Sequence, residues 1–185
     1  MGMRIIGGEH KGRKIKQPKL CTVRPTKDRV REAVFSIIAA KLPNSKVLDL
    51  FAGSGAYGLE ALSRGSKSAV FIEKNKKTVE VLRENIQMLK LEGDATVLPL
   101  DIKEGLELLS RNQQIFDIII CDPPYNRGLV KKTLIMISHY DILSHSGLMI
   151  MEHHRDEGIP QSEGNVFVCK QKSYGNILIS VFQKT

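Results

Sequence analysis

Four acidic residues follow apolar segments of the chain at equivalent places. Asp49, Glu73, Asp101 and Asp122 stand at or just after the carboxyl ends of segments that we expect to be β-strands. A single acid after a strand is commonly only a turn or cap residue. If the strands are parallel, however, their carboxyl ends lie along one edge of the sheet, where open α/β sheets bind ligands. Four carboxylates there predict a site for a ligand that carries hydroxyl, amine or cationic groups.

A glycine-rich loop follows the first of these segments. In 47-VLDLFAGSGAYGLEA-61, Gly53, Gly55 and Gly58 have the G-x-G-x-x-G spacing of a dinucleotide-binding turn. Two adenosine-bearing cofactors fit such a loop, NAD and S-adenosylmethionine. Asp49 favours the second, because a carboxylate is unfavourable beside a pyrophosphate but favourable beside an ammonium and a sulfonium. We therefore expect Gly53 and Gly55 to allow close approach to the methionine moiety, and Gly58 to pack its helix.

Two of the acids suit the adenosine part of the ligand. Glu73 lies 18 residues after Gly55, where a carboxylate can accept both hydroxyls of a ribose, and this suits NAD and S-adenosylmethionine equally. Asp101 can accept from the adenine amino group while Ile102 covers the ring. A structural turn explains Asp101 equally well.

The stretch 117-DIIICDPPYN-126 indicates the chemistry. It places an acid, a rigid turn and an aromatic ring after a buried strand, in the residues Asp122, Pro123, Pro124 and Tyr125. The prolines fix φ and remove two backbone donors, so nearby carbonyls point outward without internal partners. Such acceptors can orient the exocyclic amine of a base towards an electrophilic methyl group, while Tyr125 stacks on a base taken out of its helix. The sequence leaves open whether Asp122 only orients the amine or also relays its proton.

The excess positive charge lies entirely at the N-terminus. The formal net charge of the chain is +8, and residues 1–31 carry ten basic and two acidic side chains. Such a block attracts polyanions, because each phosphate contact releases condensed counterions. Glycines at positions 7, 8 and 12 favour a hairpin over a solvated tail. We expect contacts with nucleic acid from Arg4, Lys11, Arg13, Lys14, Lys16, Arg29, Arg31 and, unless it only packs its turn, Tyr174.

These sites need a scaffold of alternating strands and helices. Apolar periodicity and turn residues predict helices at about 26–41, 59–64, 76–91, 103–110 and 129–140. They predict strands at 46–50, 68–72, 95–100, 116–121, 148–153, 166–171 and 177–183. The last two strands have no helix between them. The sequence therefore predicts an α/β fold, with a doubly wound, mainly parallel seven-stranded sheet and an antiparallel C-terminal hairpin.

The motifs resemble those of a known family. D-P-P-Y is a member of the [DNS]-P-P-[YFW] motif of amino-group methyltransferases, and D-L-F-A-G-S-G-A-Y-G-L-E-A looks like their cofactor loop. Together with 4-RIIGGEHKGRKI-15 and 24-RPTKDRVREAVFSII-38, these stretches resemble the RsmD-type 16S ribosomal RNA guanine-N2 methyltransferases over essentially the whole chain. The resemblance implies a Rossmann-like class I methyltransferase fold with S-adenosylmethionine as donor. The implied target is the N2 amine of a loop guanine in 16S RNA, methylated when ribosomal proteins are already bound.

The resemblance also assigns residues. It makes Asp122 to Tyr125 the catalytic turn. Length predicts a single domain, 1–185, and charge makes residues 1–25 its basic RNA-binding extension. Many members carry phenylalanine where this chain has Tyr125, and either ring can stack. The cofactor-binding residues are Asp49, Phe51, Ala52, Gly53, Ser54, Gly55, Glu73, Lys74, Asp101, Ile102 and, from the R-P-T stretch, Arg24 and Thr26.

Composition limits the setting. The longest apolar runs are too short to span a bilayer, and the N-terminus lacks the apolar region of a secretory signal. Three widely spaced cysteines support neither a disulfide framework nor a zinc site. His153 and His154 are adjacent on a strand and so point to opposite faces, which disfavours a shared metal. We expect a cytoplasmic monomer without a metal centre.

Three other functions stay open. A methyltransferase for amino groups of DNA or protein would share D-P-P-Y. An NAD-dependent oxidoreductase has no need of D-P-P-Y and is disfavoured by Asp49. A non-catalytic RNA-binding assembly factor would be free to lose the acids at the four strand ends.

Overall fold

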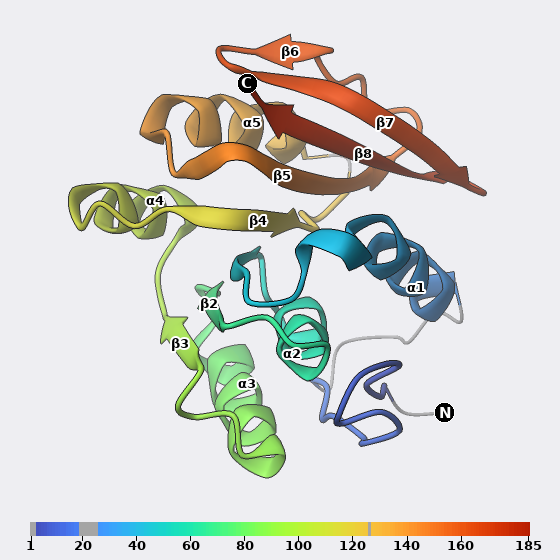
Figure 1. Ribbon diagram of the computed structural model, residues 1–185, viewed down its shortest axis with the longest axis vertical. Coiled ribbons are helices and arrows are strands. Elements are labelled where there is room, and N and C mark those ends of the chain that lie inside the picture. The colour runs from blue at the N-terminus through green and yellow to red at the C-terminus, as the bar shows by residue number, and fades with distance from the viewer. Residues whose placement is uncertain (1–2, 19–25, 126) are drawn as a thin grey trace.

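The computed structural model describes residues 3–18, 26–125 and 127–185. Within them the chain forms one mostly parallel sheet flanked by helices (Figure 1). The helices are α1 (Thr26–Ile38), the 3-10 turn η1 (Ala39–Lys41), α2 (Ala56–Ser63), α3 (Lys76–Leu89), α4 (Ile102–Arg111) and α5 (Leu129–Tyr140). The strands are β1 (Lys46–Leu50), β2 (Ser68–Ile72), β3 (Ala95–Leu98), β4 (Phe116–Cys121), β5 (Leu143–His154), β6 (Ser162–Glu163), β7 (Val166–Tyr174) and β8 (Ile177–Lys184).

The strand order confirms the predicted doubly wound sheet. From one edge to the other the order is β3-β2-β1-β4-β5-β8-β7-β6. The strands β3, β2, β1, β4 and β5 are parallel to one another, whereas β8, β7 and β6 continue the sheet in antiparallel pairs. The chain winds outward from β1 in both directions, so the loops after β1 and β4 diverge. Ligands bind at such a switch point, at the carboxyl ends of the strands.

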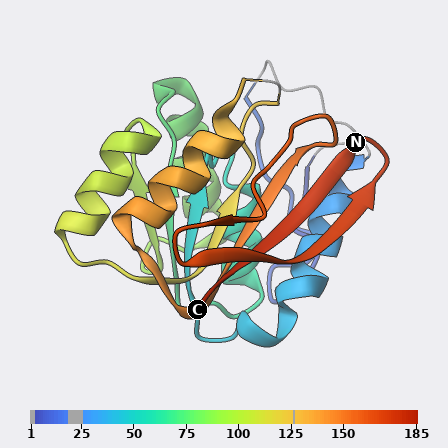
Figure 2. The ribbon, with the colours of Figure 1, turned by 90° about the horizontal axis from the view of Figure 1, so that it is seen from above.

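Side chains of the central strands alternate between two helical layers. Val47 and Ile118 belong to a core cluster that includes residues of α1, α2 and α3, whereas Leu48 and Ile119 belong to a second cluster that includes residues of α4 and α5. Figure 2 shows α4 and α5 on one side of the sheet and α1 on the other. Burial on both faces explains why β4 is almost wholly apolar.

The N-terminal segment forms the predicted hairpin. Arg4 and Lys14 form an antiparallel bridge, and the side chains of Ile5 and Ile15 are buried in the first core cluster. Ser63 at the end of α2 accepts two hydrogen bonds from backbone amides of the hairpin. One amide donates to its carbonyl oxygen at 2.7 Å, and the other donates to its hydroxyl oxygen at 3.0 Å. The hairpin is therefore a packed part of the fold.

In the described part of the chain, the largest differences from the predicted strands concern β5 and β6. β5 begins at Leu143, not at residue 148, because a bulge interrupts the apolar pattern: Phe116 pairs with Leu143, while Ile118 pairs with Leu148. β6 makes the sheet eight-stranded, not seven-stranded, and its two residues are too few to give an alternating pattern. No helix in the described part of the chain combines the length and apolar character needed to cross a bilayer.

Candidate active site

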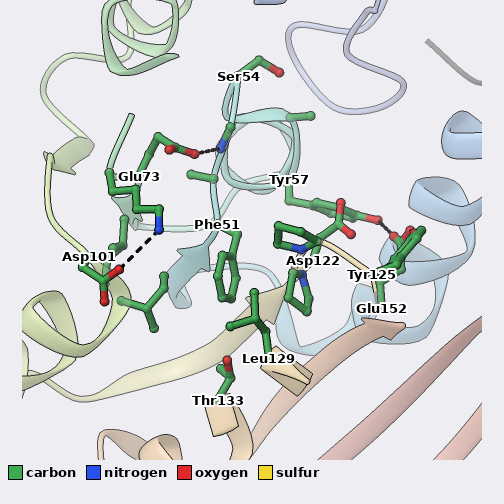
Figure 3. Close-up of a pocket in the computed structure, with 18 of the residues that line it drawn as sticks. Phe51, Ser54, Tyr57, Glu73, Asp101, Asp122, Tyr125, Leu129, Thr133 and Glu152 are labelled. Atoms are coloured by element: carbon green, nitrogen blue, oxygen red, sulfur yellow. Dashed lines mark hydrogen bonds and ion pairs between the residues drawn. The ribbon is translucent and has the colours of Figure 1, made fainter. Parts of the chain in front are cut away.

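A cavity of about 810 Å³ opens at the carboxyl edge of the parallel strands (Figure 3). The structure gathers most of the predicted cofactor and catalytic residues around it. Those that line the cavity are Phe51, Ala52, Gly53, Ser54, Glu73, Lys74, Asp101, Ile102, Asp122, Pro123, Pro124 and Tyr125. Asp49 and Gly55 lie behind this wall, and the predicted residue Arg24 and the side chain of Thr26 lie outside the described part of the chain.

The glycine loop uses its glycines in different ways. Gly53 has a φ of 57°, in the left-handed region that favours glycine, and a Cβ added there would meet only the carbonyl oxygen of Phe51, at 3.9 Å. At Gly55 an added Cβ would lie 2.4 Å from Leu82 of α3, so this glycine serves packing and not the expected approach to a ligand. At Gly58 an added Cβ would lie 2.2 Å from the Phe71 ring, which confirms its predicted packing role.

Asp49 is buried beneath the loop. Its Oδ2 accepts a hydrogen bond from the backbone amide of Gly58 in the first turn of α2, at 2.8 Å. Burial raises the pKa of Asp49 to about 7; the Gly58 amide opposes this shift, and the charge of Glu73 adds to it. The structure therefore places Asp49 as a support of α2, not in direct contact with the cavity as predicted.

Glu73 joins the end of β2 to the glycine loop. Its Oε2 accepts from the amide of Gly53 at 3.1 Å, and its Oε1 accepts from the amide of Asn75 at 2.8 Å. Each carboxylate oxygen has a second lone pair, so hydroxyl groups in the cavity can still donate to it. The residue predicted to bind a ribose is thus held in place by two backbone amides.

Asp101 has the structural role that the turn alternative predicts, and its place in the cavity wall leaves the adenine contact a prediction. It lines the cavity and also caps α4, where its Oδ1 accepts from the amide of Lys103 at 3.1 Å. Glu104 completes a capping box by accepting from the amide of Asp101 at 3.4 Å. Lys74 approaches Asp101 to 3.7 Å in an exposed ion pair, and the Ile102 side chain is 8% exposed beside it.

The D-P-P-Y turn follows β4 and borders the opposite end of the cavity. Pro124 is exposed, whereas Tyr125 is half-buried and not fully exposed as expected. The hydroxyl of Tyr125 donates to Oε1 of Glu152 at the end of β5, and its ring centroid lies 6.4 Å from that of His154. The ring is therefore fixed at both its hydroxyl end and one side.

Arg31 lies in the cavity wall, not on the surface. Its side chain is 3% exposed, and its Nη2 donates to the carbonyl oxygen of Arg4 at 2.6 Å and to Oδ1 of Asp28 at 3.2 Å. Its buried Nε has no hydrogen-bond partner among the described residues. The predicted contact of Arg31 with an RNA backbone does not fit this burial, whereas a contact with a ligand in the cavity does.

The other predicted RNA-binding side chains are distributed over the hairpin and α1. Arg4, Lys11, Arg13, Lys14, Lys16 and Arg29 are all exposed. Two of them are tied to α3: Arg13 donates to the carbonyl oxygen of Met88 at 2.6 Å, and Lys16 pairs with Glu84 at 2.9 Å. The ends of the hairpin reach the cavity, where Met3 and Gln17 line the wall. The hairpin therefore carries exposed basic side chains as well as two residues of the cavity wall.

Two further predictions concern the C-terminal half. Tyr174, at the end of β7, is partly buried and packs against the first core cluster, as the packing alternative expects. His153 is buried and uses both ring nitrogens, with Nε2 at 2.9 Å from Ser180 Oγ and Nδ1 at 3.0 Å from the carbonyl oxygen of His154. Burial lowers the pKa of His153. These contacts give His153 a structural role.

The sequence interpretation missed two residues at the D-P-P-Y end of the cavity. Glu152 comes at the end of β5 and lines the cavity, as does Tyr57 from the start of α2. The Tyr57 hydroxyl donates to Oε2 of Glu152 at 2.5 Å. Glu152 follows the apolar residues 148–151 near the carboxyl end of β5, so the rule that singled out the four predicted acids identifies it when extended to the fifth strand. Tyr57 gives no comparable signal, because an aromatic residue in a helix is usually a core residue.

Relatives of known name share nearly the full length of the chain. The family described as Conserved hypothetical protein 95 matches residues 3–183. A Bacillus subtilis protein named putative rRNA methyltransferase YlbH is 33% identical over 182 residues, which cover 98% of this chain and 99% of the relative. An Escherichia coli protein named ribosomal RNA small subunit methyltransferase D is 34% identical over 182 residues, which cover 98% of this chain and 90% of the relative.

Solved structures agree with this relationship. A putative methyltransferase, yhhF from Escherichia coli, has a TM-score of 0.84 and 33% identity, with coverage of 100% of this chain and 98% of that one. A putative methyltransferase complexed with SAH, SMU.776, shares the fold, with a TM-score of 0.69 at 16% identity and coverage of 87% of this chain and 50% of that one. The chain therefore belongs to the Conserved hypothetical protein 95 family, the RsmD-type methyltransferases.

Proposed function

We propose that this protein transfers a methyl group from S-adenosylmethionine to the exocyclic N2 amine of a guanine in 16S ribosomal RNA. The observation that carries this proposal is the shared cavity, which joins the glycine loop and Glu73 at one end to the D-P-P-Y turn at the other. One end suits an adenosine-bearing cofactor and the other suits a flipped base, so donor and acceptor meet between them.

The cofactor half of the cavity fits S-adenosylmethionine. Glu73 offers carboxylate lone pairs to ribose hydroxyls, and Ile102 and Phe51 supply apolar surface for the adenine ring. The open side of Gly53 leaves room for the methionine moiety. The buried guanidinium of Arg31, with an unused N–H, suits the α-carboxylate of that moiety. When bound there, the cofactor supplies an electrophilic methyl group on a sulfonium.

The D-P-P-Y turn prepares the amine. Asp122 and the carbonyl groups next to Pro123 and Pro124 accept hydrogen bonds from N2, which directs the nitrogen lone pair at the methyl carbon. A nitrogen–carbon bond forms as the carbon–sulfur bond breaks, and the amine then loses one proton. Because the amine of guanine is a weak nucleophile, we attribute the rate mainly to near-attack positioning and to acceptors that favour positive charge on nitrogen. Asp122 orients the amine for this transfer.

The choice of RNA rests on the relatives and on charge. The Escherichia coli relative is named as a methyltransferase of small-subunit ribosomal RNA. The exposed basic side chains of the hairpin provide the matching surface for a phosphate backbone. We propose that the substrate is the RNA within an assembled or assembling small subunit, and that one copy of the chain acts alone.

Replacing Asp122 tests the catalytic assignment. We expect Asp122→Ala to lower kcat for 16S RNA by about 100-fold or more, because the amine loses its charged acceptor. Binding of S-adenosylhomocysteine, measured by calorimetry, and binding of RNA should stay close to wild type. Asp94→Ala, which removes an exposed carboxylate from a turn before β3, is the matched control and should keep full activity. Methylation at the wild-type rate by Asp122→Ala would refute the assignment.

A further inference from the structure

Glu152 is a buried carboxylate at the substrate end of the cavity. It ends the apolar part of β5, lines the cavity and is 4% exposed. Its two oxygens are divided between two phenols: Oε2 accepts from Tyr57 at 2.5 Å, and Oε1 accepts from Tyr125 of the D-P-P-Y turn. Figure 3 shows the three side chains meeting beside Asp122.

The two hydroxyls do not use the full capacity of this carboxylate. An ionised carboxylate has about four acceptor positions, so two stay available for donors that enter the cavity. Tyr57 is itself held in place, because its ring stacks on Phe35 of α1 with the centroids 6.2 Å apart. Burial and the charges of Glu152 and Asp122 raise the pKa of Tyr57, so its hydroxyl stays a donor. The acceptor is thus fixed in position before a base arrives.

The Watson–Crick edge of guanine is complementary to two neighbouring carboxylates. Guanine presents N1–H and N2–H as adjacent donors, whereas adenine presents an unprotonated N1 beside its amine, and cytosine presents an unprotonated N3 beside its amine. Asp122 stands at the turn that accepts from the methylated amine, and Glu152 offers a second acceptor next to it. A carboxylate opposite an unprotonated ring nitrogen would face a lone pair without a hydrogen between them, which disfavours adenine and cytosine.

We propose that Glu152 is the residue that selects guanine, by accepting a hydrogen bond from N1–H of the target base. This inference rests on the proposed function and names the specificity determinant of the same site. Tyr57 and Tyr125 hold the carboxylate in position, and Tyr125 at the same time couples the acceptor to the ring that stacks on the base.

The experiment reverses the direction of the proposed hydrogen bond between residue 152 and N1 of the base, so that the protein donates and the base accepts. The wild-type enzyme first identifies the methylated position in 16S RNA. That position is then replaced, by splinted ligation of a synthetic oligonucleotide, with 2,6-diaminopurine, which keeps the N2 amine but has an unprotonated N1. We expect the wild-type enzyme to prefer guanine by about 10- to 100-fold in kcat/KM, the discrimination typical of one well-formed base contact.

Glu152→Gln should change this preference. The amide of glutamine can donate to an unprotonated N1, so the ratio of activity on 2,6-diaminopurine to activity on guanine should rise by about 10-fold or more. Glu80→Gln, an exposed glutamate on α3, is the matched control and should leave the ratio unchanged. If Glu152 only holds the two tyrosines in place, kcat/KM falls by the same factor for both substrates, and the proposal is overturned.

The wild-type measurement keeps the proposal testable even if Glu152→Gln fails to fold. Equal methylation of guanine and 2,6-diaminopurine by the wild-type enzyme would contradict selection through N1–H. The proposed function fails separately, and earlier, if the wild-type enzyme places no methyl group on N2 of any guanine.

Discussion

At the scale of single residues, Asp49 shows that the place of a residue in the sequence does not determine which group its side chain contacts. Its place before the glycine loop is evident from the sequence, and that place predicts a contact with the cofactor. The alternation of side chains in β1 instead puts Asp49 on the face that packs against α2, where Gly58 donates to it. A strand end therefore predicts the neighbourhood of a carboxylate, whereas the strand period decides which way the side chain points.

The burial of Asp49 makes stability depend on pH. Its pKa in the folded protein is about 7, above the unfolded value of 3.8, so between these pH values the folded chain keeps a proton that the unfolded chain has lost. Stability from this group is thus greatest at low pH and falls as pH rises to about 7. Between pH 5 and 8 we expect this group to lower the free energy of unfolding of the wild type by about 3 kcal/mol. Asp49→Asn should not show this decrease.

Urea unfolding at the two pH values measures this difference. Asp94→Asn, which changes an exposed carboxylate in the same way, serves as control and should keep the wild-type dependence. The same slope in Asp49→Asn and in wild type would show that Asp49 titrates normally in the folded protein.

At the scale of elements, the sequence predicts what is periodic and misses what depends on contacts between distant segments. The helix Leu129–Tyr140 begins and ends as predicted, since its apolar spacing is regular. The start of β5 at Leu143 is hidden by the polar residues of the bulge. The docking of the hairpin on α2 and α3 is also not readable in advance, because it depends on side chains such as Asn85, whose Oδ1 accepts from the amide of Lys16 at 2.7 Å.

The hairpin is the element through which we expect RNA to bind. Lys11 and Lys14 are exposed on it, so replacing both with alanine should weaken RNA binding and reduce the slope of log Kd against log salt by about 1 per lysine. The control is the double variant Lys46→Ala with Lys170→Ala, which removes the same charge from exposed sites on β1 and β7. Filter binding over a salt series measures both. A slope unchanged by the hairpin variant would remove the hairpin from the interface.

At the scale of the whole molecule, the topology follows from the sequence more completely than the site does. Alternating strand and helix signals, and an apolar strand at 116–121, are sufficient to predict the doubly wound sheet and its ligand edge. The same signals do not predict that Arg31 turns inward, because a basic residue on a charged segment has no local mark of burial. The guanidinium takes its place in the cavity wall only in the packed fold, where it donates to the carbonyl oxygen of Arg4.

The fold also sets how the two ends of the reaction meet. The glycine loop after β1 and the D-P-P-Y turn after β4 follow neighbouring strands in the sheet, with Leu50 paired to Cys121 in the parallel register. Because both strands lie in the buried centre of the sheet, the core fixes the glycine loop and the D-P-P-Y turn relative to each other. We therefore propose a single reaction in one cavity, with the methyl donor on one side and guanine N2 on the other.

Identification of the methylated nucleoside tests this reaction. The protein is incubated with S-adenosylmethionine labelled in its methyl group and with small subunits, or naked 16S RNA, that lack endogenous methylation. The RNA is then digested to nucleosides. We predict label in N2-methylguanosine at one position, with higher yield from the subunit than from naked RNA. Label in any other nucleoside, or in protein alone, would show that guanine N2 is not the methyl acceptor.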